Sequence, residues 1–214
     1  MKQNTERRVV ITGLGVVAPN GIGKEAFWEA TSKGVSGIKT IERSSMENLP
    51  IQVAGEINNF LANDYIERKL VNRTDRMTHF VFAATQEVLR DSNITLADVN
   101  PERVGVVISN TMGGIDFVME QIRAVYTRGP RALSAYTAIA WLQVANVGQL
   151  AIRYGLQGYC KTPVNDAAGG LDAMTLAYRT IKRGSADVII AGGCEAFIHP
   201  FILFVFAHDR DYYI

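Results

Sequence analysis

The stretch Asn165-Asp166-Ala167-Ala168-Gly169-Gly170 has the pattern of an active-site elbow whose nucleophile is missing. It lies between a β-rich run and a helical one, so we expect a strand to end at Asn165 and a helix to begin near Gly169, with residue 167 on a sharp turn. Backbone N–H groups at such a helix start can stabilise an anion or a thioester carbonyl oxygen. The methyl group of Ala167, however, cannot attack an electrophile. The pattern therefore predicts the architecture of a covalent-catalysis site without its chemistry.

Two other sequence patterns for chemistry are incomplete. Gly13-Leu14-Gly15 follows an apolar run and Ala18 fits the looser third position of a dinucleotide-binding motif, but Pro19-Asn20-Gly21 interrupts the helix that should follow. We interpret this segment as a structural turn. There is also no GxSxG motif to anchor a hydrolase triad.

The histidines and cysteines do not predict a metal site. The three histidines lack the spacing of metal ligands, and His79, inside an expected helix, is expected to be a packed or surface residue. Cys194 could lie near the elbow in space, but a buried, inert thiol is the favoured interpretation. We therefore predict no metal and no cofactor. The remaining members of this set are Cys160, His199 and His208.

Composition excludes several classes of protein. The chain has 214 residues, 48% of them apolar, which is enough for a substantial core. Its 22 basic and 21 acidic residues give a net charge of +1 and no basic stripe for nucleic acid, although local patches could suit an acidic protein partner. Because no apolar run approaches the roughly 20 residues of a membrane span, and only two cysteines occur, we expect no membrane insertion and a reducing cytoplasmic location.

The elements that must position the elbow alternate between strands and helices, which predicts an α/β layered fold with a mostly parallel sheet. The run at 8–13 has the β-branched, continuously apolar pattern of a strand buried on both faces. The apolar stretch 201–207 is expected to pack against another protein surface. Strands are expected at 8–13, 104–108, 161–165 and 187–191, and helices at 24–33, 74–91, from Gly113-Gly114 toward Tyr126, at 139–154 and at 169–183.

Longer stretches of the chain resemble the N-terminal half of the β-ketoacyl-acyl-carrier-protein synthases. The resemblance rests on RRVVITGLGVVAPNG at the start, NTMGGI at 110–115, RGSADVIIAGGCEAFIHP at 183–200 and the elbow between them. In that thiolase-like family the elbow reads TACASG, and its nucleophilic cysteine corresponds to Ala167. The resemblance implies a layered αβαβα fold, of which residues 1–214 would supply roughly the first half.

One branch of the family matches better than the active enzymes. DAAGGLDAM at 166–174 is similar to the EQAGGLDAL of the chain-length factor, or ketosynthase β, of type II polyketide synthases, and the similarity extends through MGGIDF at 112–117 and NVGQLAIRYGLQG at 146–158. That resemblance implies a non-catalytic subunit that shapes a tunnel for polyketide or polyene intermediates on an acyl carrier protein. Its implied partner is a cysteine-containing ketosynthase α subunit.

The family's four tunnel-gating positions correspond to aliphatic residues here. Three of them have the i, i+3, i+7 spacing of one helical face, a spacing that by itself is more often that of a core stripe than of a gate. The family resemblance favours the gate. Some relatives carry aromatic residues at these positions, so a less obstructed tunnel is expected. The four positions are Ile115, Val118, Ile122 and Ile139.

Two departures from the family pattern leave alternatives open. Many chain-length factors have glutamine at the position of Ala167, where an amide could assist decarboxylation of malonyl units, and alanine cannot do this. One alternative is a condensing enzyme whose nucleophilic cysteine is replaced by alanine at 167, and another is a purely structural half-protein that touches no substrate.

The second departure is length. We expect residues 1–214 to require a chain that supplies the C-terminal half, because a single half would expose a large apolar face.

Overall fold

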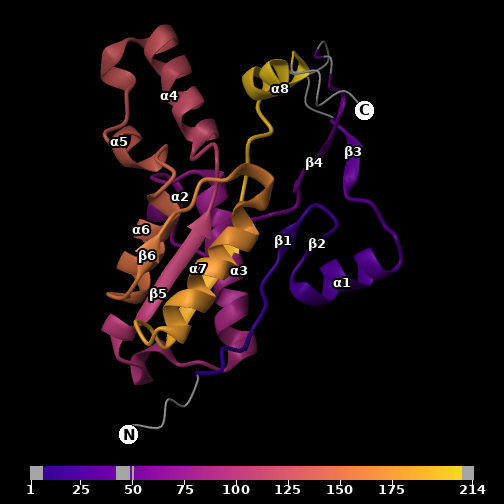
Figure 1. Cartoon of the computed structure of the whole chain (residues 1–214). Helices are drawn as coiled ribbons and strands as arrows, with labels where there is room; N and C mark the ends of the chain where they lie inside the picture. Colours follow the sequence, from indigo (N-terminus) through magenta and orange to yellow (C-terminus); the bar gives the residue numbers. More distant parts are fainter. Residues whose placement is uncertain (1–6, 42–48, 50, 209–214) are drawn as a thin grey trace, which may run out of the picture.

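The computed structural model describes residues 7–41, 49 and 51–208. Figure 1 shows a central sheet with helices on both sides and several smaller elements beyond it. In chain order the elements are β1 Val17–Ala18, β2 Gly21–Ile22, α1 Lys24–Ser32, β3 Ile38–Thr40, β4 Val53–Gly55, η2 Ala62–Asp64, α2 Arg68–Val71, α3 Arg76–Ser92, η3 Leu96–Asp98, η4 Pro101–Arg103, β5 Val104–Ser109, α4 Ile115–Arg128, η5 Pro130–Ala132, α5 Thr137–Ala140, α6 Ala145–Tyr154, β6 Cys160–Lys161, η6 Asp166–Ala168, α7 Gly169–Lys182, β7 Val188–Gly193 and α8 Pro200–Ala207.

The central sheet has the order β6-β5-β7, and both pairings are parallel, as predicted. Its register pairs Val106 with Cys160 on one side and Val104 with Val188 on the other. All six residues of β5 are buried, which explains its uninterrupted apolar sequence, since a middle strand covered on both faces has no solvent side.

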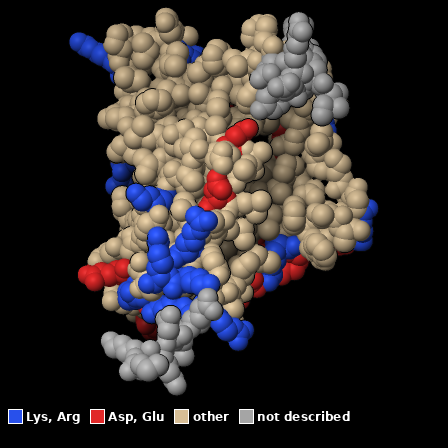
Figure 2. All heavy atoms as spheres, in the orientation of Figure 1, with Lys and Arg blue, Asp and Glu red and all other residues tan. Residues whose placement is uncertain are grey.

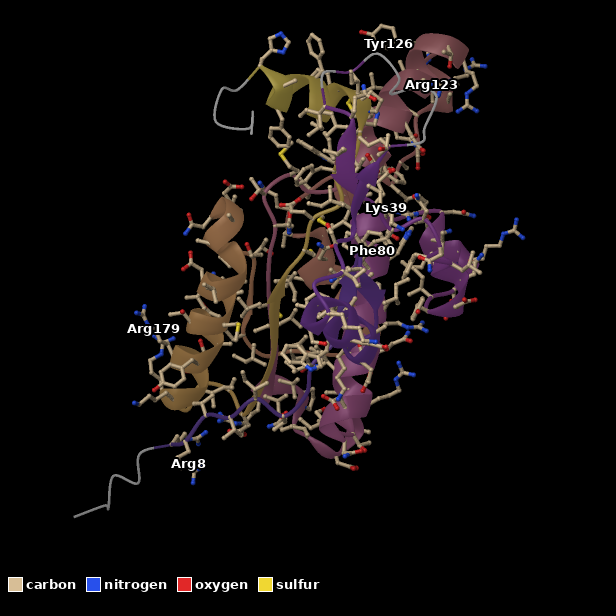
Figure 3. The ribbon with its side chains drawn as sticks, turned by 90° about the vertical axis from the view of Figure 1, so that its right-hand side faces the viewer. Arg8, Lys39, Phe80, Arg123, Tyr126 and Arg179 are labelled. Carbon is tan, nitrogen blue, oxygen red and sulfur yellow. The ribbon has the colours of Figure 1, made fainter. Side chains whose placement is uncertain are left out.

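Helices cover both faces of this sheet, with α3 and α6 on one face and α7 on the other (Figures 1 and 3). On one face, Phe82 of α3 and Leu150 of α6 pack with Val104 and Val106 of β5 in the main core. On the other face, α7 buries small residues, Ala173 and Ala177 among them. Because small side chains let a helix approach closely, α7 lies directly against β5 and β7.

The smaller elements extend outward from these layers. β1 pairs with β2, and β3 pairs with β4, in two short antiparallel ladders. Helices α4 and α5, which we call the arm (residues 115–140, with the connection between them), project away from the sheet at the upper left of Figure 1. Among the described residues, no helix has both the length and the apolar character that crossing a membrane requires.

Basic side chains gather at the end of the molecule where α7 terminates (Figure 2), the region of Arg8 and Arg179 in Figure 3. There Asp187 accepts hydrogen bonds from Arg103 and from Arg7, the latter at 2.9 Å. The hydrogen bonds from Arg103 and then Arg7 hold the pKa of Asp187 well below its ordinary value. On the face shown in Figure 2, the basic side chains form a local patch rather than an extended stripe.

The expected strand at 8–13 is not present. Val10 and Ile11 are 63% and 68% exposed, and the segment has no ladder partner in the described part of the chain. The chain instead runs along α3, where the amides of Leu14 and Val16 donate to Asp91 and Glu87, each at 2.8 Å. β-branched sequence favours an extended chain, but a strand also needs a neighbour to pair with.

Two other elements are shorter than expected. The helix expected at 139–154 is divided into α5 and α6, because the carbonyls of Trp141 and Gln143 between them accept tertiary hydrogen bonds instead of helical ones. The strand expected at 161–165 is limited to Cys160–Lys161. Pro163 has no N–H to donate to a ladder, so the chain leaves β5 before it.

The other expected elements are present within a few residues of their expected ends. Gly34, Gly155 and Gly184 have φ values of 69°, 65° and 79°, as expected of glycines that terminate helices. In α8, Ile202 and Leu203 are buried while Phe201 and Phe204 are about half exposed. The packing of this helix against another protein surface stays a prediction.

Candidate functional site

The elbow is a sharp turn, as the sequence predicts. Asp166 has φ +40°, a region that few residues other than glycine occupy and that Asp and Asn tolerate best. Residues 166–168 form the single turn η6, closed by the Ala168 amide donating to the Asn165 carbonyl at 3.1 Å, and α7 begins at Gly169. Ala167 is exposed, so its methyl group lies where a nucleophile would be accessible.

The elbow rests on the carboxyl ends of two parallel strands. A Cβ atom at Gly169 would lie 1.9 Å from Ser109 Oγ at the end of β5, and one at Gly193 would lie 3.1 Å from the Cα of Gly170. Glycine is thus required at position 169 by contact with Ser109 and not by its backbone angle. The Asn165 side chain donates to the Asp172 carboxylate, which fixes the approach to the turn.

Beneath the elbow lies a buried polar chain. Thr78 Oγ1 donates to Asn146 Oδ1 at 2.7 Å, and Asn146 Nδ2 donates to Cys194 Sγ at 3.1 Å. The amide of Cys194 donates to the Ser109 carbonyl at 3.0 Å. Burial, reinforced by the nearby Glu195, raises the pKa of the Cys194 thiol far above its ordinary value, so this cysteine stays protonated and unreactive. Cys194 therefore lies near the site in space as an inert thiol, but its side chain is only partly buried.

Glu195 closes the far side of this region. Its carboxylate accepts the amides of Thr111 and, at 3.3 Å, Met112. Burial is the largest cause of the raised pKa of Glu195, the two amides oppose it, and the charge of Asp166 adds to it. The loop after β5 is consequently fixed to the loop after β7.

His79 is a packed core residue. It is buried on α3 with its Nε2 atom 3.1 Å from Thr74 Oγ1. Burial lowers the pKa of His79 to about 4, so it is neutral at physiological pH. This confirms the expectation of a packed side chain.

The four positions predicted to form a gate lie on the arm. Ile115, Val118 and Ile122 share one face of α4, and Ile139 comes from the separate helix α5. Ile115 and Val118 are half-buried, whereas Ile122 and Ile139 are 43% and 54% exposed. The only fully buried residue of α4 is Ala124. The described chain does not bury this face completely, and its role as a gate stays a prediction.

Two cavities lie beside α3. One of about 300 Å³ lies between α3, residues 15–17 and the end of β7, and another of about 200 Å³ is lined by Phe80, Asp116 and Glu195 among others. Phe80 is labelled near the middle of Figure 3. None of the four gate residues lines either cavity.

Sequence reasoning missed Asp75 and Asn110, which hold the base of the arm. Asp75 is 2% exposed, and its two carboxylate oxygens accept from Met77 of α3 and Phe117 of α4, at 2.8 and 2.9 Å. Burial raises the pKa of Asp75 to about 6, against the lowering effect of these two hydrogen bonds. An aspartate directly before a helical pattern indicates a cap on α3. The sequence contains no signal for the second helix that it contacts.

Comparison with known proteins identifies the family. Residues 6–210 match the family model described as "Beta-ketoacyl synthase, N-terminal domain". The chain belongs to the β-ketoacyl synthase family. This confirms the resemblance predicted from the motifs and the elbow.

Several relatives of this β-ketoacyl synthase chain carry polyketide names. It is 41% identical over 196 residues to a Streptomyces halstedii protein named for a polyketide beta-ketoacyl synthase 2, covering 91% of this chain and 47% of the relative. It is 38% identical over 192 residues to the tetracenomycin polyketide synthase ketoacyl synthase beta subunit of Streptomyces glaucescens, covering 90% of this chain and 47% of the relative. The resemblance to the ketosynthase β branch is thus confirmed. The chain spans about half the length of the curated relatives it matches.

A solved structure confirms the fold. The ishigamide ketosynthase/chain length factor matches with a TM-score of 0.86 at 21% identity, covering 95% of this chain and 51% of that one. The thiolase-like fold expected from the resemblance is therefore confirmed for this β-ketoacyl synthase chain.

Proposed function

We propose that this chain acts in a non-catalytic, chain-length-determining subunit of a type II polyketide or polyene ketosynthase heterodimer. One observation carries the proposal. The elbow keeps its turn, its glycine contact with Ser109 and its exposed residue 167, yet that residue is alanine. A site with intact geometry and no attacking atom suits a subunit whose partner supplies the chemistry.

The proposed role of the chain is to shape a tunnel. A growing acyl chain is apolar and flexible, so the length that a tunnel accepts depends on the size of the side chains along its wall. The arm offers four aliphatic positions that the described chain does not bury completely: Ile115, Val118, Ile122 and Ile139. Because neither described cavity includes them, we propose that they form a tunnel wall only together with another protein surface.

The proposed partners rest on the resemblance to the ketosynthase β branch. They are a cysteine-containing ketosynthase α subunit, an acyl carrier protein that delivers intermediates, and a second half of the thiolase-like domain. We propose that residues 1–214 form the N-terminal half, an assignment supported by the span of about half the relatives' length. A cytoplasmic location is also proposed, with the two free cysteines in its support.

The gate assignment predicts shorter products when the wall is made bulkier. Ile115→Phe and Ile122→Phe, each assembled with the cognate ketosynthase α and carrier protein, should shift the product distribution toward shorter chains, because a phenyl ring occupies space that an acyl chain would use. Product lengths are measured by mass spectrometry. Ile152→Phe is the matched control, because Ile152 is a 79% exposed isoleucine on α6, outside the arm. Unchanged products in both arm variants would refute the gate.

A condensing enzyme with its cysteine replaced at 167 is the second candidate, favoured by the intact elbow. Ala167→Cys separates the two. We expect this variant to load labelled acyl groups from carrier protein poorly and to condense at no more than a few per cent of the ketosynthase α rate, because a thiol nucleophile needs a neighbouring base and His79 is buried against Thr74. Loading is followed by intact-protein mass spectrometry. Robust condensation by the variant, with the ketosynthase α nucleophile removed, would favour the second candidate.

A further inference from the structure

The gate helix α4 has no cap of its own. Its N-cap residue is Gly114, which has no side chain to accept from the first turn. A side chain at 114 is excluded, because a Cβ atom there would lie 2.1 Å from the Ala140 carbonyl oxygen and 2.8 Å from the Cβ of Asp75. The first turn of α4 therefore needs an acceptor from elsewhere in the fold.

Asp75 supplies that acceptor from another helix. One carboxylate oxygen accepts the Met77 amide and caps α3, while the other accepts the Phe117 amide in the first turn of α4. A single carboxylate thus joins the N-termini of two helices, where negative charge is favourable for both. The burial of Asp75 means that water cannot replace either bond.

A second contact fixes the other end of the arm. The Gly114 amide donates to the Trp141 carbonyl at 3.1 Å, directly after α5. Asn110, 2% exposed, donates to the Gln143 carbonyl at 2.8 Å and accepts the Gly113 amide at 3.2 Å. The start of α4 and the end of α5 are thereby held to one another at the base of the arm.

We propose that Asp75 is a positioning residue for chain length, which sets the orientation of α4 and hence the places where Ile115, Val118 and Ile122 project. Phe117, whose amide it holds, lies between the first two of these residues in the first turn of the helix. The proposal rests on the proposed gate function. It assigns specificity to a buried residue that acts through the position of α4.

The test is Asp75→Asn in the assembled ketosynthase complex. Asparagine has one acceptor oxygen in place of two, so one helix N-terminus loses its partner while the shape of the side chain is kept. We expect amide hydrogen exchange in the first turn of α4 or α3 to accelerate about tenfold, the effect of losing roughly one buried hydrogen bond. The product distribution should broaden to neighbouring chain lengths, whereas a merely structural role would lower all products in proportion.

Controls separate this inference from the gate proposal. Asp98→Asn makes the same chemical change at an exposed position on η3, at the opposite end of β5 from the arm, and should change neither readout. If Ile115→Phe shifts the products and Asp75→Asn does not, the positioning role is refuted and the gate stands. If Asp75→Asn, Ile115→Phe and Ile122→Phe all leave the products unchanged, both proposals fail. Wild-type exchange rates in both first turns of Asp75→Asn would also overturn the positioning role.

Discussion

The residue that most constrains the elbow is Gly169. Its φ of −58° suits any residue, and alanine would by itself favour a helix by up to about 1 kcal/mol over glycine. The contact with Ser109 opposes this, because an added Cβ would lie 1.9 Å from Oγ and 3.0 Å from Cβ of that buried side chain. Rotation of the hydroxyl group would relieve only the first of these contacts.

We therefore predict that Gly169→Ala destabilises the protein by about 1–3 kcal/mol, the usual effect of overpacking. Urea unfolding of the assembled complex measures the change. Gly148→Ala is the control, because Gly148 lies inside α6 with no atom within 4 Å of its added Cβ, and that variant should be neutral or slightly more stable. Equal effects of the two substitutions would contradict the contact argument. Adding Ser109→Ala to Gly169→Ala should recover part of the loss.

At the scale of the elements, the sequence pattern predicted those helices, strands and turns that depend on neighbouring residues. The buried run of β5 and the glycines after α1, α6 and α7 correspond to a real strand and real helix ends, because periodicity and positive φ are properties of neighbouring residues. The turn at the elbow is predictable for the same reason. The absence of a nucleophilic side chain at Ala167 is visible directly in the sequence.

The features that the sequence did not predict correctly have a common physical cause. The 8–13 segment has strand composition but no partner to pair with, and the break between α5 and α6 depends on donors from Gly114 and Asn110, more than 20 residues away in the chain. The role of Asp75 toward α4 is likewise a long-range contact, 42 residues apart. Single-sequence patterns carry no information about such pairs.

At the scale of the whole molecule, apolar surface remains uncovered on several sides. The exposed side chains include Val10, Ile11 and Leu14 on the 8–16 segment, Leu171, Met174 and Tyr178 along one side of α7, and Phe201, Phe204 and Val205 on α8. At about 25 cal/mol per Å², some 400 Å² of such surface left in water corresponds to about 10 kcal/mol, comparable with the entire stability of a typical domain.

We therefore predict that residues 1–214 expressed alone self-associate and unfold without a single cooperative transition. Co-expression with the second half of the domain and with ketosynthase α should give one assembled species with one sharp transition, since burial of these surfaces adds to stability by mass action. Analytical ultracentrifugation and calorimetry are the measurements. A monomeric, cooperatively unfolding preparation of residues 1–214 alone would contradict the proposed need for a second half.

Ser109 and Asn110 are consecutive in the chain but hold different parts of the molecule, the first in contact with Gly169 of the elbow and the second bonded to the loops at the base of the arm. Their Cα atoms are separated by one trans peptide, about 3.8 Å, which does not stretch. If the arm sets the length of acyl chains, the base of the arm is thereby held at a fixed place relative to the elbow. Substitutions further along the arm would then change the accepted chain length without moving the base of the arm relative to the elbow.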